Sequence, residues 1–295
     1  MSNFKTNISS KIQTNRPKLS VSSLKTYVSI LFNISKKINP ENDSVDWFSD
    51  RWELIMDSLE EKTIQTRKTS LSALYVLTEK TEYREVMLNL LKEINETYKE
   101  QKKNVKQTEN WLSVTEIKDV YSSLLDKATK MLTNRKIMNE PLMMSFWLVA
   151  LLGGVSGVSP RRSTDNGLMK IRNYDVEVDN YYKNGFFYFN SYKTSKKYGL
   201  QSIELPKQLN FLIKKWILLN EKDYLLYSSN GNKLSSSQIN RNLNDVFGKK
   251  VSVDMLRTIF LTDLYKDVPA LSQMQEVASA MGHSISQAME YVKKR

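Results

Sequence analysis

The sequence predicts an α+β fold that is mainly α-helical, with a small antiparallel β-sheet in its second half. Apolar residues recur at helical spacing through most of the first 98 residues and again after residue 206. Between these regions, residues 168–205 alternate in polarity and are rich in aromatic and β-branched side chains, which is typical of short strands. A chain of 295 residues, 40% of them hydrophobic, is long enough for two domains with a core each.

The amino-terminal part is predicted to be a basic arm followed by a helical domain. The first 40 residues contain seven lysine or arginine residues and no acidic residue. This bias is typical of a segment that follows a phosphate backbone, and also of a solvated, mobile terminus. We expect the arm over residues 1–17 and an all-helical core-binding domain over residues 18–104. Its helices are expected at 20–37, 45–59, 63–77 and 83–98.

The polar stretch 99–110 contains a single valine and is predicted to be a linker, so the second domain spans residues 105–295. A capping-box motif from Ser113 to Glu116 begins its first helix. Helices are expected at 113–131, 140–153, 206–220, 235–247, 252–266, 271–281 and 284–294. Strands are expected at 168–178, 185–192 and 200–205, with the turn between the last two at 193–199.

The apolar run 142–155 is predicted to be a buried helix rather than a membrane span. Its apolar part has about 14 residues, whereas a helix needs about 20 to cross a bilayer, and glycine, serine and proline follow it. The amino terminus lacks the apolar segment of a secretory signal. We therefore expect a soluble intracellular protein.

The charge predicts a polyanionic partner. The chain has 44 lysine and arginine residues against 32 acidic residues, a formal net charge of +12 and a pI of about 9.5. Residues 1–104 contain 17 basic and 14 acidic residues, a net +3, which leaves +9 for residues 105–295. Nucleic acid and an acidic membrane surface are the candidate partners. Nucleic acid is favoured, because the sequence has no lysine-rich amphipathic helix that would indicate membrane binding.

Composition excludes several classes of site. The chain has no cysteine and one histidine, which excludes disulfides, thiol chemistry, cysteine-ligated zinc, iron–sulfur clusters and multi-histidine metal sites. Nucleotide-binding, zinc-protease and serine-hydrolase motifs are absent, and no acidic pair indicates two-metal catalysis. We therefore expect no metal and no cofactor.

Two arginines after the buried helix are the first candidate site residues. Arg161 and Arg162 follow a turn of glycine, serine and proline, and Asp165 comes shortly after them. Arginines in such apolar surroundings need an anionic partner. A structural ion pair with Asp165 would account for one of the two.

The other candidates are a lysine, a third arginine, a histidine and a tyrosine. Lys193 begins the turn 193–199 with two further lysines, a composition that is also usual in hairpin tips for solubility. Arg257 lies beside the apolar face of a predicted helix. His283 starts a helix, and Tyr291 lies about two turns further on. Singly, such a histidine is more often a cap and such a tyrosine more often packs in a core.

In combination and in this order, these residues resemble the active site of the tyrosine recombinases, the family of phage integrases. The matching elements are Arg162 with Asp165, Lys193 followed by threonine, Leu256-Arg257 with Phe260, and Gly282-His283-Ser284 with Tyr291. The resemblance covers residues 105–295, while the helical domain is similar to the family's core-binding domain in size, position and helical content. It implies as catalytic residues Arg162, Lys193, Arg257, His283 and Tyr291.

The resemblance implies a site-specific DNA recombinase. In this chemistry the tyrosine attacks a phosphodiester to give a 3′-phosphotyrosine and a free 5′-hydroxyl. The two arginines and the histidine donate hydrogen bonds to the phosphate, and the lysine protonates the leaving oxygen. The covalent bond conserves the energy for rejoining, which agrees with the lack of nucleotide and metal motifs.

The implied partner is double-stranded DNA, clamped by two domains. The family synapses as a homotetramer, and we expect a monomer or dimer without DNA. The expected location is with the DNA, in the cytoplasm or nucleus of a host cell, since mobile elements and large viruses are the usual sources. Residues expected to contact DNA, mostly through phosphates, are Lys18, Lys25, Arg161, Lys196, Lys197 and Arg241.

Two features depart from the family pattern. Asp254 lies three residues before Arg257, where the family usually has histidine or lysine. Only four residues follow Tyr291, too few for the carboxy-terminal helix that many members exchange between protomers. A type IB topoisomerase, whose chemistry is closely related, and a catalytically inactive DNA-binding relative are the alternative interpretations.

Overall fold

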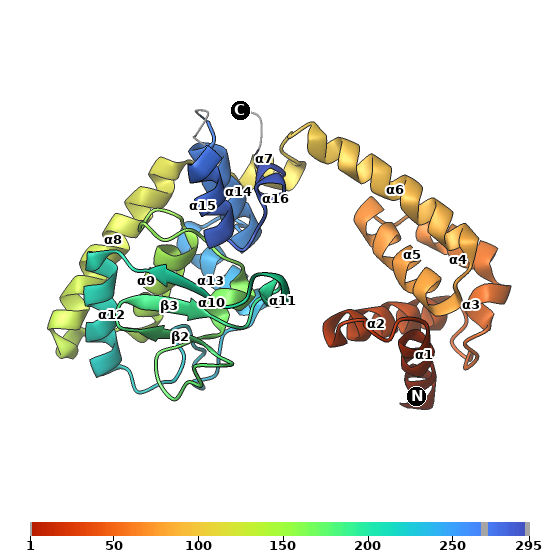
Figure 1. The fold of residues 1–295 in the computed structure, drawn as a ribbon, viewed down its shortest axis with the longest axis horizontal. Helices are drawn as coiled ribbons and strands as arrows, with labels where there is room; N and C mark the ends of the chain where they lie inside the picture. Colours follow the sequence, from red (N-terminus) through yellow and green to blue (C-terminus); the bar gives the residue numbers. More distant parts are fainter. Residues whose placement is uncertain (1, 267–270, 293–295) are drawn as a thin grey trace. The chain divides into compact units, whose positions relative to one another are not determined.

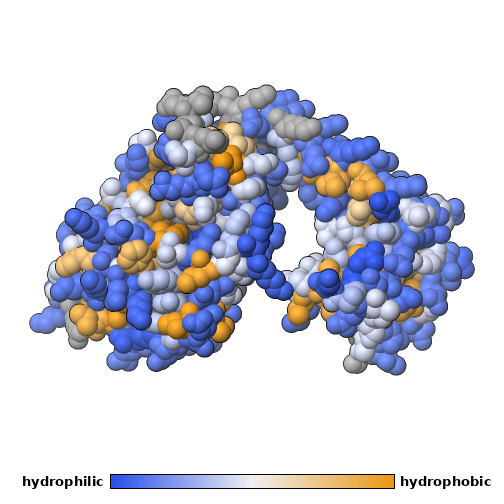
Figure 2. Space-filling model, in the orientation of Figure 1, coloured by the Kyte–Doolittle hydropathy of each residue, from blue (hydrophilic) through white to orange (hydrophobic). Residues whose placement is uncertain are grey.

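The structure, a computed structural model, describes residues 2–266 and 271–292 (Figure 1). It contains two compact units, Met1–Glu100 and Gln101–Arg295. Among the described residues, no helix combines the length and the apolar character that a membrane span requires. Hydrophilic side chains cover most of the visible surface (Figure 2).

The described elements of the first unit are all helices. They are α1 (Ser2–Asn15), α2 (Val21–Ile38), α3 (Trp47–Asp50), α4 (Trp52–Leu59), α5 (Ile64–Thr78) and α6 (Thr81–Lys99). Leu31 and Phe48 are fully buried in the core, and the Tyr83 hydroxyl donates to the Phe48 carbonyl at 2.7 Å. The helix expected at 45–59 is split, because Arg51 leaves the helical conformation (φ −110°, ψ 34°) between α3 and α4.

The amino terminus differs from the expected basic arm. It forms α1, whose Phe4, Ile8 and Ile12 are at most 6% exposed and belong to the core of the first unit. Asn15 at the end of α1 donates to the Leu77 carbonyl at 2.9 Å. The spacing of these three apolar side chains decides the structure, because a helix is stabilised mainly by packing of its apolar face.

The second unit is built around the apolar helix α9. Its helices are α7 (Val105–Asn110), α8 (Val114–Thr133), α9 (Glu140–Leu152), α10 (Ser163–Gly167), α11 (Ser195–Tyr198), α12 (Lys207–Leu219), α13 (Ser236–Phe247), α14 (Val253–Leu264), α15 (Leu271–Ala280) and α16 (Ile285–Met289), with a 3-10 turn at Arg135–Ile137. In α9, all side chains from Phe146 to Leu152 are buried. Part of the expected linker forms α7 instead, because Asn104 and Gln107 make a capping box.

The sheet has four strands in the order β1-β2-β3-β4. They are β1 (Met169–Lys170), β2 (Asn180–Lys183), β3 (Phe186–Phe189) and β4 (Gln201–Glu204). β1 and β2 are parallel and the other pairs antiparallel, so the sheet is mixed rather than antiparallel as expected. The strand predicted at 168–178 is wrong: after β1 the backbone turns at Asn173 (φ 47°), and the next strand begins at Asn180.

The last helices form a small core of their own. Leu261 of α14, Met281 after α15 and Ala288 of α16 are fully buried in it. The helix expected at 284–294 is shorter, because α16 ends at Met289, and residues 293–294 lie outside the described residues. The prediction of a mainly helical α+β fold is confirmed, with a mixed sheet.

Candidate active site

Helix α14 places Arg257 in the interior of the second unit. The helix begins after Ser252, whose side chain accepts from the Met255 N–H. Arg257 lies one turn further on and is 1% exposed. Asp254, in the first turn of α14, is 79% exposed and places its Oδ1 3.1 Å from Nη1 of Arg257. A buried guanidinium therefore has one carboxylate partner at the surface.

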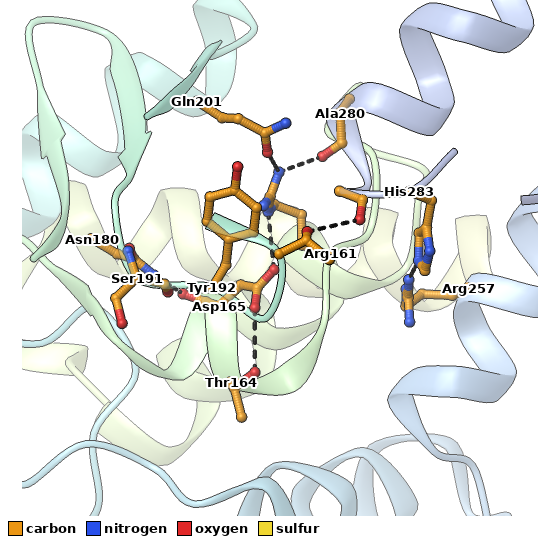
Figure 3. A network of polar contacts seen from close by, with 12 residues as sticks. Arg161, Thr164, Asp165, Asn180, Ser191, Tyr192, Gln201, Arg257, Ala280 and His283 are labelled. Atoms are coloured by element: carbon orange, nitrogen blue, oxygen red, sulfur yellow. Dashed lines mark hydrogen bonds and ion pairs between the residues drawn. The ribbon is translucent and has the colours of Figure 1, made fainter. Parts of the chain in front are cut away.

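The turn between α15 and α16 directs His283 towards Arg257. Gly282 adopts φ +72°, a conformation that favours glycine, and the His283 N–H donates to the Ala278 carbonyl at 2.8 Å. The His283 ring is 2% exposed, and its Nε2 contacts Nη2 of Arg257 (Figure 3). The reversal of the chain at Gly282 thus brings the histidine to α14.

His283 is a neutral imidazole near pH 7. Its pKa is lowered to about 4, mainly by burial and also by the positive charges of Arg257, Arg162 and Arg161, while a hydrogen bond to Gln287 acts in the opposite direction. Because a guanidinium only donates hydrogens, the Nε2 facing Arg257 is the unprotonated nitrogen. The resemblance implied that the histidine donates to phosphate, whereas this nitrogen accepts from Arg257.

Tyr291 completes a group of three. Its hydroxyl lies 3.4 Å from Nη1 of Arg257, and the Arg257 guanidinium lies 5.0 Å from the centre of its ring. The rings of Tyr291 and His283 are 5.3 Å apart, edge to face. The structure therefore brings together Arg257, His283 and Tyr291 from α14, the α15–α16 turn and the segment after α16.

Arg161 is buried, at 1% exposed, contrary to the expected contact with DNA, and two of its three guanidinium nitrogens bond to protein groups, while Nη2 has no hydrogen-bond partner among the described residues. Its Nε lies 3.2 Å from Oδ2 of Asp165, and its Nη1 donates to Gln201 Oε1 (2.8 Å) and to the Ala280 carbonyl (2.7 Å) (Figure 3). Burial lowers the pKa of Arg161 and raises the pKa of Asp165. Asp165, the acid expected beside Arg162, pairs with Arg161 instead, and Arg162 is the N-cap residue of α10.

Arg162 remains available for an anion. It is partly exposed, and its Nη1 has no hydrogen-bond partner among the described residues. This nitrogen lies 3.5 Å from the position that a Cβ on Gly282 would take. A second arginine donor thus faces the turn that carries His283.

Lys193 is placed near the site by its backbone only. The next residue, Thr194, donates from its hydroxyl to the Gly282 carbonyl at 3.3 Å. The Lys193 side chain is exposed, and within the described ranges it makes no hydrogen bond or ion pair. The catalytic role of Lys193 therefore stays a prediction.

The other expected DNA-binding residues are exposed. Lys18 and Lys25 belong to the first unit, while Lys196 and Lys197 lie on α11 and Arg241 on α13. In the part of the chain that the structure describes, no cluster of three or more potential ligands could hold a metal ion.

Sequence reasoning missed the partners of Arg161. Gln201 lies 40 residues and Ala280 119 residues further along the chain, and the latter contributes only its backbone carbonyl. Every residue has a backbone carbonyl, so the residue type at position 280 does not indicate this contact. The position of Thr194 directly after the candidate residue Lys193 indicates that it lies near the site. Its contact with the Gly282 turn, however, depends on the tertiary fold.

No protein-family model matches the sequence, and no curated protein matches it. Among solved structures, the chain is similar to a crystal structure of a lambda integrase dimer bound to a COC′ core site, with a TM-score of 0.55 and 14% identity, covering 99% of this chain and 76% of that chain. It is also similar to a second lambda integrase dimer structure on that site (TM-score 0.48, 14% identity, 97% and 96% covered). A third similarity is to a crystal structure of XerA recombinase (TM-score 0.43, 15% identity, 99% and 94% covered).

Proposed function

We propose that this chain, which has the fold of the tyrosine recombinases, is a site-specific DNA recombinase that acts through a 3′-phosphotyrosine intermediate. The observation that carries the proposal is the convergence of three side chains. One nitrogen of Arg257 contacts the His283 ring, and the other lies 3.4 Å from the Tyr291 hydroxyl. A hydroxyl nucleophile beside a fixed guanidinium is the arrangement that attack on a phosphodiester requires.

The arginines stabilise the phosphate. Its pentacoordinate transition state carries an additional negative charge, which fixed donors stabilise without reorganisation. Arg257 and Arg162 bind the non-bridging oxygens, for which the planar fork of a guanidinium supplies donors in fixed geometry. His283 accepts from Arg257 and so orients the guanidinium towards Tyr291.

Strand cleavage exchanges one phosphate ester for another. The Tyr291 oxygen forms a bond to phosphorus as its proton leaves to solvent, and the bond from phosphorus to the 5′-oxygen breaks. Lys193, whose side chain is exposed, donates a proton to that oxygen. Rejoining reverses these steps: the 5′-hydroxyl of a partner strand attacks the phosphotyrosine and releases Tyr291.

Duplex DNA is the proposed partner. The lambda integrase of the comparison is a dimer bound to a core site, and we extend DNA binding to this chain on the strength of its net charge of +12. Phosphate contacts are proposed for exposed basic residues of both units, namely Lys18, Lys25, Lys196, Lys197 and Arg241. We propose that four protomers assemble on the synapsed DNA.

Covalent trapping tests the function. The full chain is incubated with a library of nicked duplexes, in which the short cleaved strand diffuses away and rejoining is blocked, and is then denatured. We expect a protein–DNA adduct with the wild type and none with Tyr291→Phe, which removes a single oxygen. No adduct despite salt-sensitive DNA binding would contradict the proposal and favour an inactive relative. Relaxation of supercoiled DNA by single protomers would instead favour a topoisomerase.

A further inference from the structure

The buried guanidinium of Arg161 joins three elements that are distant in the sequence. It pairs with Asp165 of α10, and its Nη1 donates to Gln201 of β4 and to the Ala280 carbonyl at the end of α15. Its planar group lies over the Phe189 ring at 4.1 Å. Figure 3 shows the contacts with Asp165, Gln201 and Ala280 converging on the Arg161 side chain.

The end of α15 is held from two sides. Arg161 binds the Ala280 carbonyl at 2.7 Å, and Gln201, itself bound to Arg161, donates to the Ser279 carbonyl at 3.2 Å. The turn with Gly282 and His283 begins directly after these residues. Any shift of the Arg161 guanidinium therefore moves the start of the turn.

The same guanidinium limits the space at the turn. An atom at the Cβ position of Gly282 would lie 3.3 Å from Nη2 of Arg161. Glycine at this position allows the turn to pack directly on the two arginines. The position of His283 is thus set by Arg161 through a carbonyl on one side and by close packing on the other.

We propose that Arg161 is a positioning residue that fixes the Gly282–His283 turn and thereby holds His283 against Arg257. Its contribution to strand cleavage rests on the proposed recombinase function. This role does not require Arg161 to touch DNA, because its side chain is 1% exposed and its Nε and Nη1 bond to protein acceptors, which leaves only the buried Nη2 without a partner among the described residues.

The chain itself provides a probe of the turn. His283 is the only histidine in the sequence, so its imidazole resonances are identified without assignment. A pocket of about 420 Å³ lined in part by Gln201, Ser279 and His283 adjoins the turn, so a loosened turn admits water to the ring. The charged groups that act on the ring are Arg257 of α14 and the two arginines before α10.

The first arm measures the pKa of His283 by NMR in the full chain, without DNA. The wild type should titrate at about 4. Arg161→Lys keeps the positive charge, but one ammonium cannot serve Asp165, Gln201 and Ala280 in the geometry of the planar fork. We expect the pKa to rise by about one unit or more in this variant, because the ring becomes solvated.

Two further variants separate position from charge and from general stability. Arg161→Met keeps the length of the side chain but removes both the donors and a positive charge that lowers the pKa of His283, so the rise should be larger than in the lysine variant, and the rise in the lysine variant alone reports position. Lys170 lies on β1 and forms an ion pair with Asp179 at 2.8 Å, and none of the proposed catalytic residues takes part in this pair. Lys170→Met removes the pair. It should leave the pKa of His283 unchanged, and a similar rise there would contradict the proposal.

The second arm compares cleavage with DNA binding. In single-turnover trapping at saturating DNA, Arg161→Lys should cleave about tenfold or more slowly than the wild type, with a Kd within about threefold. An unchanged pKa of His283 in both Arg161 variants would overturn the proposal, as would weaker binding with an unchanged saturating rate. If the wild type forms no adduct, the recombinase function fails, and the NMR arm still decides whether Arg161 positions His283.

Discussion

Asp254 is the acidic neighbour of the proposed phosphate-binding arginine. Its Oδ1 lies 3.1 Å from the same Arg257 nitrogen that lies 3.4 Å from the Tyr291 hydroxyl. A phosphate oxygen at this nitrogen must compete with the carboxylate. Because Asp254 is 79% exposed, its ion pair is well solvated and contributes at most about 1 kcal/mol.

We therefore expect Asp254→Asn to bind DNA about three- to fivefold more tightly, a gain that corresponds to about 0.6–1 kcal/mol. Fluorescence anisotropy with the full chain at fixed salt measures the change. Asp263→Asn is the matched control, since it removes the acid of another i,i+3 ion pair on α14 and changes the net charge equally. Equal gains in both variants would show a general charge effect and refute a specific competition at Arg257.

The buried histidine links stability to pH. Its folded pKa of about 4 lies below the ordinary value of 6.5. Between these values the unfolded chain binds a proton that the folded chain excludes, so stability is present above pH 6.5 and is lost as the pH falls towards 4. From pH 7 to pH 5, we expect the free energy of unfolding to fall by about 2 kcal/mol from this residue.

Urea denaturation of the wild type and of His283→Gln at both pH values isolates this contribution, because the remaining acidic groups are common to the two proteins. The wild type should lose more stability than the variant. Parallel pH dependences would mean that the imidazole is not held neutral in the folded state.

At the scale of elements, the α15–α16 turn has the tightest requirement. Gly282 combines φ +72° with a Cβ position 3.3 Å from Arg161 Nη2, whereas Gly248 at the end of α13 has φ +62° with nothing within 4 Å of its Cβ position. An alanine at either position would be strained by the positive φ, at a cost of about 1 kcal/mol. Only at Gly282 would the added methyl group also press against the Arg161 side chain.

We expect Gly248→Ala to cost about 1 kcal/mol of stability and to leave DNA cleavage intact. Gly282→Ala should cost more and should lower the yield of covalent adduct about tenfold or more, because the turn must move away from the arginines. Thermal unfolding and trapping on the same substrates measure both effects. Similar behaviour of the two variants would show that the packing of Gly282 on Arg161 has no role.

Most helices could be predicted, because their boundaries depend on local signals. The Ser113–Glu116 capping box and the apolar run of α9 predicted α8 and α9 to within two residues. The strands could not be predicted as well, since the parallel pairing of β1 with β2 is a tertiary contact. Helix α1 has a local signal in the spacing of Phe4, Ile8 and Ile12, but its basic composition is equally typical of a solvated arm, and only the packing of these side chains in the core distinguishes the two.

The order of the candidate site residues along the chain could be predicted from the sequence, but the separate role of each residue could not. Arg161 and Arg162 are adjacent and chemically identical, and their roles separate only through the start of α10 and through Gln201 and Ala280 far along the chain. The protonation of His283 likewise depends on its burial, which a single histidine in a sequence does not reveal.

At the scale of the whole molecule, the basic excess belongs to the second unit. Residues 101–295 contain 29 basic and 18 acidic residues, a net +11, and residues 1–100 contain 15 and 14, a net +1. Lysines that contact DNA in the proposed complex should contribute to affinity mainly by releasing counterions, so their effect should depend on salt and not on sequence.

We expect the double variant Lys196→Gln/Lys197→Gln to weaken binding to all duplexes alike and to lower the salt slope by about two. The matched control is Lys214→Gln/Lys215→Gln on α12, which removes the same charge from an exposed helix outside the proposed site. If both double variants lower the salt slope of binding equally, the lysines of α11 make no specific phosphate contact with DNA.

In the proposed reaction, the Tyr291 hydroxyl forms a covalent bond with DNA. The most direct test is mass spectrometry of the trapped adduct after nuclease and protease digestion, with the wild-type full chain. We expect the nucleotide phosphate on the phenol oxygen of Tyr291. Attachment to any other residue, or no covalent attachment to a protein that binds DNA, would contradict the account.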